Sequence, residues 1–287
     1  MSTKSDVIFP ILIPSLLTPP INGRAIGALA QAAGNALYRR LSTILNALVD
    51  GISNGLGDKE ELYSALITTL LSINSDEGCH PLLQHILSLM KHEDIKKKNI
   101  IFDVLPEFFK ETTLDYSIYT EDIVVQCIYL LNDENEELAK KAFETLTILV
   151  KRQTKESLEK LVYPAQQTLS YIPSGTKDIY AFTLPRGPSC VLPIFLHGLM
   201  YGNPQQREIS ANGISIIIDH TPAAGLKPFV TLIVGPLIRV IGERFSSDVK
   251  SAILLALNKL FSKIPQFLYP FIPQLQRTFI KSLSDPY

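Results

Sequence analysis

Hydrophobic residues recur along nearly the whole chain at spacings of three and four residues, whereas the alternation typical of β-strands is nearly absent. The clearest example is the stretch from Asp248 to Ile264, in which Lys250 lies on the face opposite the apolar residues. The apolar face there consists of Val249, Ile253, Ala256, Leu257 and Leu260. Ser246 or Ser247 is expected to cap this helix, and Asp248 lies near its positive end. The pattern predicts an amphipathic helix.

The stretch before it, Phe229 to Gly242, is almost entirely apolar and predicts a second helix, separated from the first by the polar break at 244–248. A pair of this kind cannot bury its apolar surface by itself. It needs a further pair on each side, so the rest of the chain is expected to supply such pairs.

The same periodicity predicts helices over 6–17, 21–33, 36–52, 60–73, 77–90, 95–111, 117–131, 134–152, 155–171, 189–200, 205–220, 226–242, 248–264 and 267–283. Within 21–33 a face of small residues is expected to allow close packing: Ala25, Ala28, Leu29 and Ala32. The segment 172–188 contains three prolines and two glycines and cannot be one continuous helix. It is expected to be a long loop between repeats that projects from one ridge.

A short motif repeats at intervals of roughly 40 residues, which is within the range of HEAT and armadillo helix pairs. A basic residue is followed three, six and seven positions later by apolar or small residues, starting at Lys250 and Arg207 and, with a weaker fit, at Lys140 and Lys97. The sequence therefore predicts an all-α fold, a HEAT/armadillo-like α-solenoid of about six to seven helix pairs. Residues 1–287 are expected to form this solenoid as a single domain.

Composition narrows the classes of protein that fit. Of the 287 residues 46% are hydrophobic and 19% are charged, so the chain is not of a disordered type. Its net charge of −1 argues against direct nucleic-acid binding, which needs clustered excess lysine and arginine. Cys79, Cys127 and Cys190 lie far apart, as expected for reduced, mostly buried thiols of a cytoplasmic protein.

No signal peptide is evident, and no uninterrupted run of about 18 apolar residues occurs, so no membrane contact is expected. The chain opens directly in an apolar helix, which is expected of a segment of a longer protein whose first helix packs on an upstream neighbour.

No constellation of residues predicts catalysis, a metal site or a cofactor. Cys79, His80, His85 and His92 are the only cluster reminiscent of metal ligands, and their spacing matches none of the usual zinc patterns. The GxSxG, HExxH and Walker motifs are absent, and the segment 173–177 lacks the glycine spacing of a phosphate loop. The basic runs 96–98 and 151–152 are interpreted as solvated helix faces, or as weak contacts with RNA or an acidic partner.

Arg239 is the informative exception, because it lies inside an apolar helix. Gly235, Pro236 and Gly242 stand three and four positions away, where they surround it on its own face. Small residues there leave a low floor under the guanidinium, which is typical of a binding hot spot. The alternative is an exposed Arg239 paired with Glu243 at i+4, worth a few tenths of a kcal/mol. The residues alone leave both interpretations open.

One long stretch carries a resemblance to a known family. The sequence YGNPQQREISANGISIIIDHTPAAGLKPFVTLIVGPLIRVIGERFSSDVKSAILLALNKLF, followed by PFIPQLQRTFIKSLSD, resembles the C-terminal part of the general control nonderepressible activators. These are very large ribosome-associated HEAT-repeat proteins that activate the starvation-sensing kinase of translation initiation factor 2 alpha. The match covers Leu184 to Asp285, including LPRGPSCVLPIFLHGLMYGN, whereas the first half is similar only in repeat style.

The resemblance implies that this segment binds RWD domains, chiefly the one at the N-terminus of the kinase. It also implies that a basic residue in PLIRVIGERF is needed for this binding, and the matching position is Arg239. The expected partner-binding residues are Arg239, Arg244, Lys250, Phe271 and Arg277. Phe271 and Ser284 lie in the same region as packing residues, and Tyr269 stands where arginine is expected, so the surface beside Phe271 differs here.

Two functions follow as hypotheses. In the first, the chain is a non-enzymatic interaction module that binds the RWD domain of the kinase, while the ribosome is bound by parts of the full-length protein outside this chain. In the second, the repeats are a structural scaffold or a cargo-binding solenoid without contact to the kinase.

Overall fold

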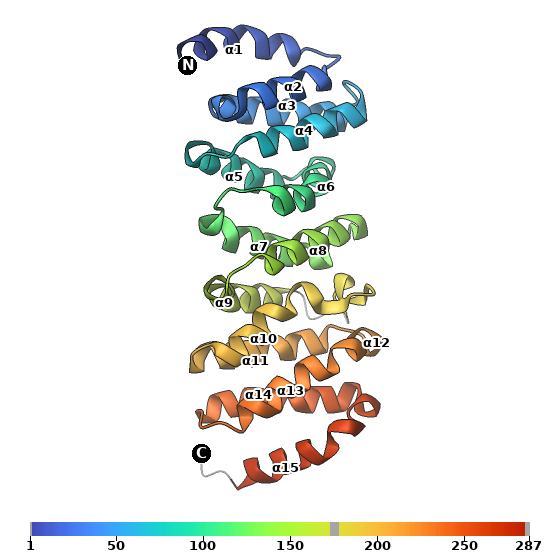
Figure 1. Cartoon of the computed structure of the whole chain (residues 1–287). Helices are drawn as coiled ribbons and strands as arrows, with labels where there is room; N and C mark the ends of the chain where they lie inside the picture. Colours follow the sequence, from blue (N-terminus) through green and yellow to red (C-terminus); the bar gives the residue numbers. More distant parts are fainter. Residues whose placement is uncertain (1, 173–177, 285–287) are drawn as a thin grey trace. The chain divides into compact units, whose positions relative to one another are not determined.

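The computed structural model describes residues 2–172 and 178–284 (Figure 1). They are helical nearly throughout, and within these ranges the only extended pairing is an isolated bridge between Ile21 and Gly57. The chain divides into two compact units, Met1–Ile123 and Val124–Tyr287. Each unit is described by itself below.

The first unit begins with α1 (Ser2–Leu16), a continuous helix that contains Pro10 and Pro14. The following elements are α2 (Gly23–Ala33), the 3₁₀ helix η1 (Gly34–Arg40), α3 (Leu41–Asn54), α4 (Lys59–Ser72), α5 (Asp76–Met90), α6 (Ile95–Glu111) and η2 (Ser117–Tyr119). Helix α7 (Thr120–Tyr129) crosses the boundary between the units. Helix α2 packs along α4, and both α3 and α4 pack against α6, so each helix pair buries its apolar face on the next pair.

The second unit continues with η3 (Leu130–Asn132), α8 (Glu136–Lys151), α9 (Lys155–Tyr171), η4 (Tyr180–Thr183), η5 (Gly187–Cys190), α10 (Leu192–Tyr201) and α11 (Pro204–Asp219). It ends with α12 (Ala223–Leu226), η6 (Lys227–Phe229), α13 (Val230–Ile241), α14 (Ser247–Lys263), η7 (Pro265–Phe267), η8 (Tyr269–Phe271) and α15 (Ile272–Leu283). The pair α10–α11 is followed by the pair α13–α14, with α11 against α14 and α10 against α13. This stacking of consecutive pairs confirms the predicted all-α solenoid of the HEAT class.

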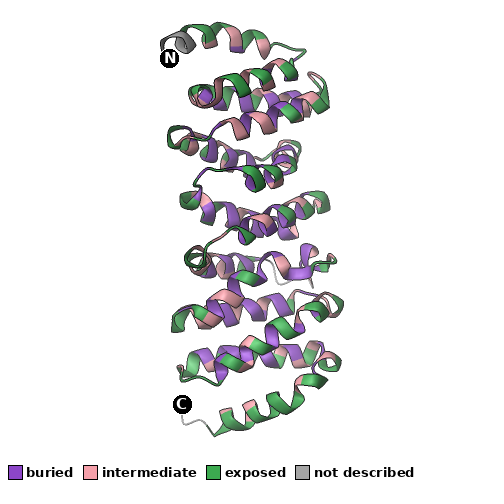
Figure 2. Cartoon of the chain, viewed as in Figure 1, coloured by how far each residue is buried: buried purple, intermediate pink, exposed green. Residues whose placement is uncertain are grey.

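The repeating motif marks the buried faces of the second helices. The residues three, six and seven positions after Lys250, Arg207 and Lys140 are all buried, as Figure 2 shows for the helices as a whole. The fit that starts at Lys97 fails at one position, because Asp103 is exposed and accepts a hydrogen bond of 2.8 Å from Tyr63 Oη. A polar residue at that position is accommodated at the surface between α4 and α6.

Two local predictions in the first unit were wrong. The residues 34–40 form a 3₁₀ helix and not the start of an α-helix, because Gly34 ends α2 with a φ of +50° and turns the chain. The predicted small-residue face of α2 is not its buried face: Ala28 and Ala32 are exposed, and α2 instead buries Gly23, Ile26 and Ala30. A β-carbon on Gly23 would lie 2.7 Å from the backbone of Glu61, so this glycine permits the close approach of α4.

The expected loop 172–188 is also corrected within its described part. Residues 178–188 contain η4 and the start of η5, and they are packed inward: Ile179, Ala181 and Phe182 are fully buried. Both η4 and η5 contact α8, and Ile179 N donates to His220 O over 2.9 Å. The segment therefore supplies core residues between α8 and the end of α11. The expectation for 173–177 lies outside the described residues.

No membrane-spanning stretch was predicted, but Ala223–Ile241 is long and apolar enough to cross a membrane by length and composition. This run is not one regular helix, since it joins α12, η6 and α13. In α13 one face is buried and packs against α10, α14 and α15. The residues of this face are Val230, Ile233, Val234, Leu237, Val240 and Ile241. The packing is that of a core helix of a repeat.

Candidate partner-binding surface

Arg239 lies on the exposed face of α13, in the setting predicted for it. Gly235 and Gly242, on the same face, are also exposed, and a β-carbon placed on Gly235 would meet nothing within 4 Å. Leu232, two turns before Arg239, is 54% exposed and extends this face with an apolar side chain. We call Leu232, Gly235, Arg239 and Gly242 the shelf of α13.

The alternative partner of Arg239 is not engaged. Within residues 2–172 and 178–284, Arg239 forms neither an ion pair with Glu243 nor a side-chain hydrogen bond. The guanidinium thus stands in solvent over a glycine floor, with its five N–H donors available to another molecule. Leu232, the apolar part of the shelf, could not be predicted from the sequence because it falls in an apolar run in which an exposed leucine looks like any core residue.

A second feature is a groove between the α13–α14 turn and the last turns of α15. It has a volume of about 1000 Å³ and is lined by Ile241, Gly242, Glu243, Arg244, Phe245, Ser246, Ser247, Lys250, Thr278, Lys281, Ser282 and Ser284. Arg244, Lys250 and Lys281 are basic, whereas Glu243 is the one acidic side chain of the lining. The groove therefore offers a positive field to an acidic segment.

The N-terminus of α14 adds to this field. Ser246 occupies the N-cap position in an extended conformation, as predicted, but its side chain accepts no capping hydrogen bond from the helix. The first amides of α14 therefore have no side-chain cap from Ser246, and both Ser246 and Ser247 line the groove. Asp248 lies in the first turn, as expected for a carboxylate near the positive helix end.

The five predicted residues do not form one cluster. Arg244 and Lys250 line the groove, whereas Arg239, Phe271 and Arg277 do not. Phe271 is half-buried in η8 at the opposite end of α15, about 16 Å along the helix from Ser282. Arg277 is exposed one turn before Lys281 on α15. Ser284, expected only to pack, also lines the groove.

Lys281 is a basic residue of the groove that the sequence pattern did not predict. It lies at the end of α15 and reaches back to the α13–α14 turn, where its Nζ donates to Gly242 O over 3.4 Å. A separation of 39 residues hides this contact in the sequence. The signal was nevertheless present, because one repeat length separates the two residues.

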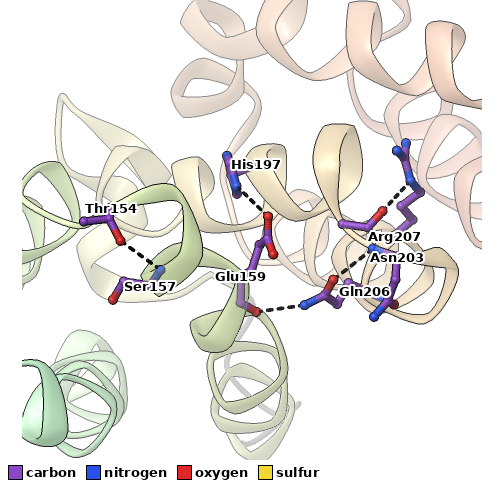
Figure 3. Close-up of polar contacts among 8 residues, drawn as sticks. Thr154, Ser157, Glu159, His197, Asn203, Gln206 and Arg207 are labelled. Carbon is purple, nitrogen blue, oxygen red and sulfur yellow. Dashed lines mark hydrogen bonds and ion pairs between the residues drawn. The ribbon is translucent and has the colours of Figure 1, made fainter.

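A polar network joins α9, α10 and α11 (Figure 3). Asn203 caps α11, and Gln206 completes the capping box by accepting from Asn203 N. Gln206 Nε2 also reaches Glu159 O on α9 over 3.4 Å, and Glu159 Oε1 lies 3.4 Å from His197 Nε2 on α10. Arg207, next on α11, donates to Gly202 O and Leu199 O at the end of α10, both over 2.8 Å.

Among the side chains described, which are those of residues 7–172 and 178–284, no three His, Cys, Asp or Glu lie close enough to hold a metal ion. Burial raises the pKa of the thiols of Cys127 and Cys190, which are both free. Burial is also the main reason that the pKa of Cys79 is raised. A raised pKa disfavours the nucleophilic thiolate.

The stacked helix pairs define an all-α HEAT-repeat protein. Residues 8–186 match the family described as "Stalled ribosome sensor GCN1-like, HEAT repeats". The chain belongs to this family. The match covers the half of the chain that had resembled the family only in repeat style.

Curated relatives match the chain along almost its whole length. It is 56% identical to the "eIF-2-alpha kinase activator GCN1" of Saccharomyces cerevisiae, with 99% of this chain and 11% of the relative covered. It is 31% identical to the "Stalled ribosome sensor GCN1" of Homo sapiens and 36% identical to the "eIF-2-alpha kinase activator GCN1" of Dictyostelium discoideum, again over 11% of each relative. The chain thus spans about a tenth of the length of these relatives.

Among solved structures, a crystal structure of importin beta matches with a TM-score of 0.39 and 16% identity, over 98% of this chain and 39% of that one. An engineered protein matches with a TM-score of 0.31 and 15% identity, over 84% and 89% of the two chains. Likenesses at this level are no evidence of function.

Proposed function

We propose that this chain is a non-enzymatic interaction module that binds the RWD domain of the eIF-2-alpha kinase and so helps to activate it. The observation that carries the proposal is the shelf of α13, where Arg239 stands exposed and unpaired among described residues on a glycine floor. The 56% identity to a relative named as an activator of this kinase supports it. Transfer of phosphate belongs to the kinase, and this chain supplies recruitment.

The shelf and the groove have complementary roles in this proposal. An arginine above a flat apolar floor can be desolvated by a partner and act as a hot spot. The groove, with Arg244, Lys250 and Lys281, attracts an acidic segment and orients it. Arg277 and Phe271 remain on α15 as candidate contacts at the margin of this surface.

The setting of the complex follows from the relatives. Because the human and mouse relatives are named as stalled ribosome sensors, the ribosome is proposed as a partner of the longer protein, bound through parts outside this chain. The cytoplasm is then the proposed location. Membrane and direct nucleic-acid contacts are not part of the proposal.

A binding titration against the purified RWD domain of the kinase tests the proposal. Arg239→Ala should weaken binding by about 1–2 kcal/mol, which is roughly 5- to 30-fold, without changing the thermal stability. Arg40→Ala is the matched control, because Arg40 is an exposed arginine in the other unit and its loss should leave the affinity unchanged. Equal affinity of Arg239→Ala and the parent would remove Arg239 from the site.

Salt dependence separates the groove from the shelf. Arg244→Ala should mainly slow association and reduce its dependence on ionic strength, because rim charges steer encounter. If the parent chain itself fails to bind the RWD domain, the chain is instead a structural HEAT scaffold or a cargo-binding solenoid without kinase contact.

A further inference from the structure

Arg207 makes two kinds of contact at once. The edge of its guanidinium donates to Gly202 O and Leu199 O, both at 2.8 Å, where α10 ends. Cζ of the same group lies over the ring of Phe245, 4.4 Å from the ring centroid. Phe245 belongs to the α13–α14 turn, in the next helix pair. A planar guanidinium can donate in its plane and stack above it, which a lysine cannot do.

The turn has few other anchors. Gly242, Glu243 and Arg244 are exposed, and the backbone bonds of the turn are local ones of 3.1–3.2 Å to residues two and three positions earlier. From outside the turn, Lys281 Nζ reaches Gly242 O over 3.4 Å, a long hydrogen bond. The half-buried ring of Phe245 is therefore the part of the turn that is held by the preceding repeat.

We propose that Arg207 is a positioning residue: it holds Phe245, and through Phe245 it fixes the α13–α14 turn so that Arg244 stands at the groove. Arg207 does not line the groove and need not touch a partner. Its effect on binding rests on the proposed function of the groove, but its effect on the turn does not. The guanidinium that donates to the last carbonyls of α10 thereby connects the α10–α11 pair to the α13–α14 turn of the next pair.

The first test needs no partner. Amide hydrogen exchange of residues 242–247 in the full 287-residue chain should become about fivefold faster in Arg207→Gln, a change of the size expected for losing a partly exposed cation–π contact. Phe245→Leu removes the ring but leaves both hydrogen bonds of Arg207 in place, so it should accelerate exchange in the turn and not in α10. Unchanged exchange in the turn for Phe245→Leu would overturn the proposal. The proposal would also be overturned if Arg207→Gln accelerated amide exchange equally in α10, α11 and the turn. Arg207 would then only cap α10.

A double-mutant cycle against the RWD domain is the second test. Arg207→Gln alone should weaken binding about fivefold, yet it should cost nothing further in the background of Arg244→Ala. Phe245→Trp, which keeps an aromatic face under the guanidinium, should keep amide exchange in the turn as slow as in the parent. Full additivity of Arg207→Gln and Arg244→Ala would overturn the proposal. Failure of the parent to bind would sink the proposed function, whereas the exchange experiment would still decide whether Arg207 holds the turn.

Discussion

The ring of Phe195 in α10 occupies the space that a side chain on Gly213 in α11 would need. A β-carbon on Gly213 would lie 2.4 Å from Cε1 of the ring, and Phe195 is fully buried and cannot swing away. Gly213→Ala should therefore destabilise the second unit by about 1–3 kcal/mol through overpacking, despite a gain in helix propensity of about 1 kcal/mol. Equilibrium denaturation by urea measures the change.

The matched control is Gly235→Ala in α13, where the added carbon meets nothing within 4 Å. The same chemical change should there stabilise the protein by about 0.5–1 kcal/mol, because alanine loses less backbone entropy on folding than glycine. Similar effects of the two substitutions would contradict the tight fit between α10 and α11.

Phe182 tests whether the segment between α9 and α10 is core or loop. Its side chain is fully buried in η4, against α8. Phe182→Ala should cost about 3–5 kcal/mol, the range for deleting a buried aromatic side chain. Tyr171→Ala, at a position 77% exposed at the end of α9, should cost less than about 0.5 kcal/mol and serves as the control. A loss at Phe182 as small as that at Tyr171 would restore the interpretation as a projecting loop.

Periodicity predicted much of the fold, because long amphipathic helices bury one face regardless of their neighbours. It placed α9 at Lys155–Tyr171, as observed, and it marked the buried positions after Arg207 and Lys250. Periodicity failed where the backbone departs from the α-helix for reasons that the pattern of hydrophobic residues does not reveal. Gly34 turns the chain through a left-handed φ, and η4 and η5 fill the core without helical spacing.

The site was predictable only residue by residue. Arg239 was singled out because a charge among apolar and small residues is visible locally, and the structure places this residue on an exposed face. Lys281 and the pairing of Arg207 with Phe245 were missed, since these contacts join residues 38–39 positions apart in successive helix pairs. To predict such contacts one must know which residues of one helix pair lie beside which residues of the next. The repeating motif gives this alignment only to within one helical turn.

The two buried thiols predict how stability depends on pH. Burial raises the pKa of Cys127 and Cys190 in the folded chain above the value of about 8.5 for an exposed thiol. A raised folded pKa means that the stabilisation is fully present below pH 8.5. Above it, thiols of the unfolded chain ionise while those of the folded chain do not, so stability is lost as pH rises, by up to about 1.4 kcal/mol per pH unit for each thiol.

Denaturation midpoints between pH 7 and pH 9.5 measure this slope, below the range in which lysines titrate. The double variant Cys127→Ala, Cys190→Ala should show a flatter profile, while Cys79→Ala, at a partly exposed thiol, should change the slope less. A slope that is the same in the parent and the double variant would mean that other groups cause the loss.

The open floor at Gly235 offers a test of the shelf that leaves every charge in place. Gly235→Tyr adds a ring beside Arg239 where nothing beyond the neighbouring backbone of α13 lies within 4 Å of the new β-carbon, so folding should be unaffected or slightly improved. A partner seated on the shelf would meet this ring, and its affinity should fall at least tenfold, or about 1.4 kcal/mol. Ser251→Tyr puts the same ring at an exposed position of α14 outside both the shelf and the groove, and should bind like the parent.

If Gly235→Tyr binds normally while Arg239→Ala does not, the partner reaches the guanidinium from its outer side and leaves the glycine floor in water. The hot spot would then be an isolated charge contact, which should weaken steeply with added salt, and not a desolvated arginine on an apolar surface.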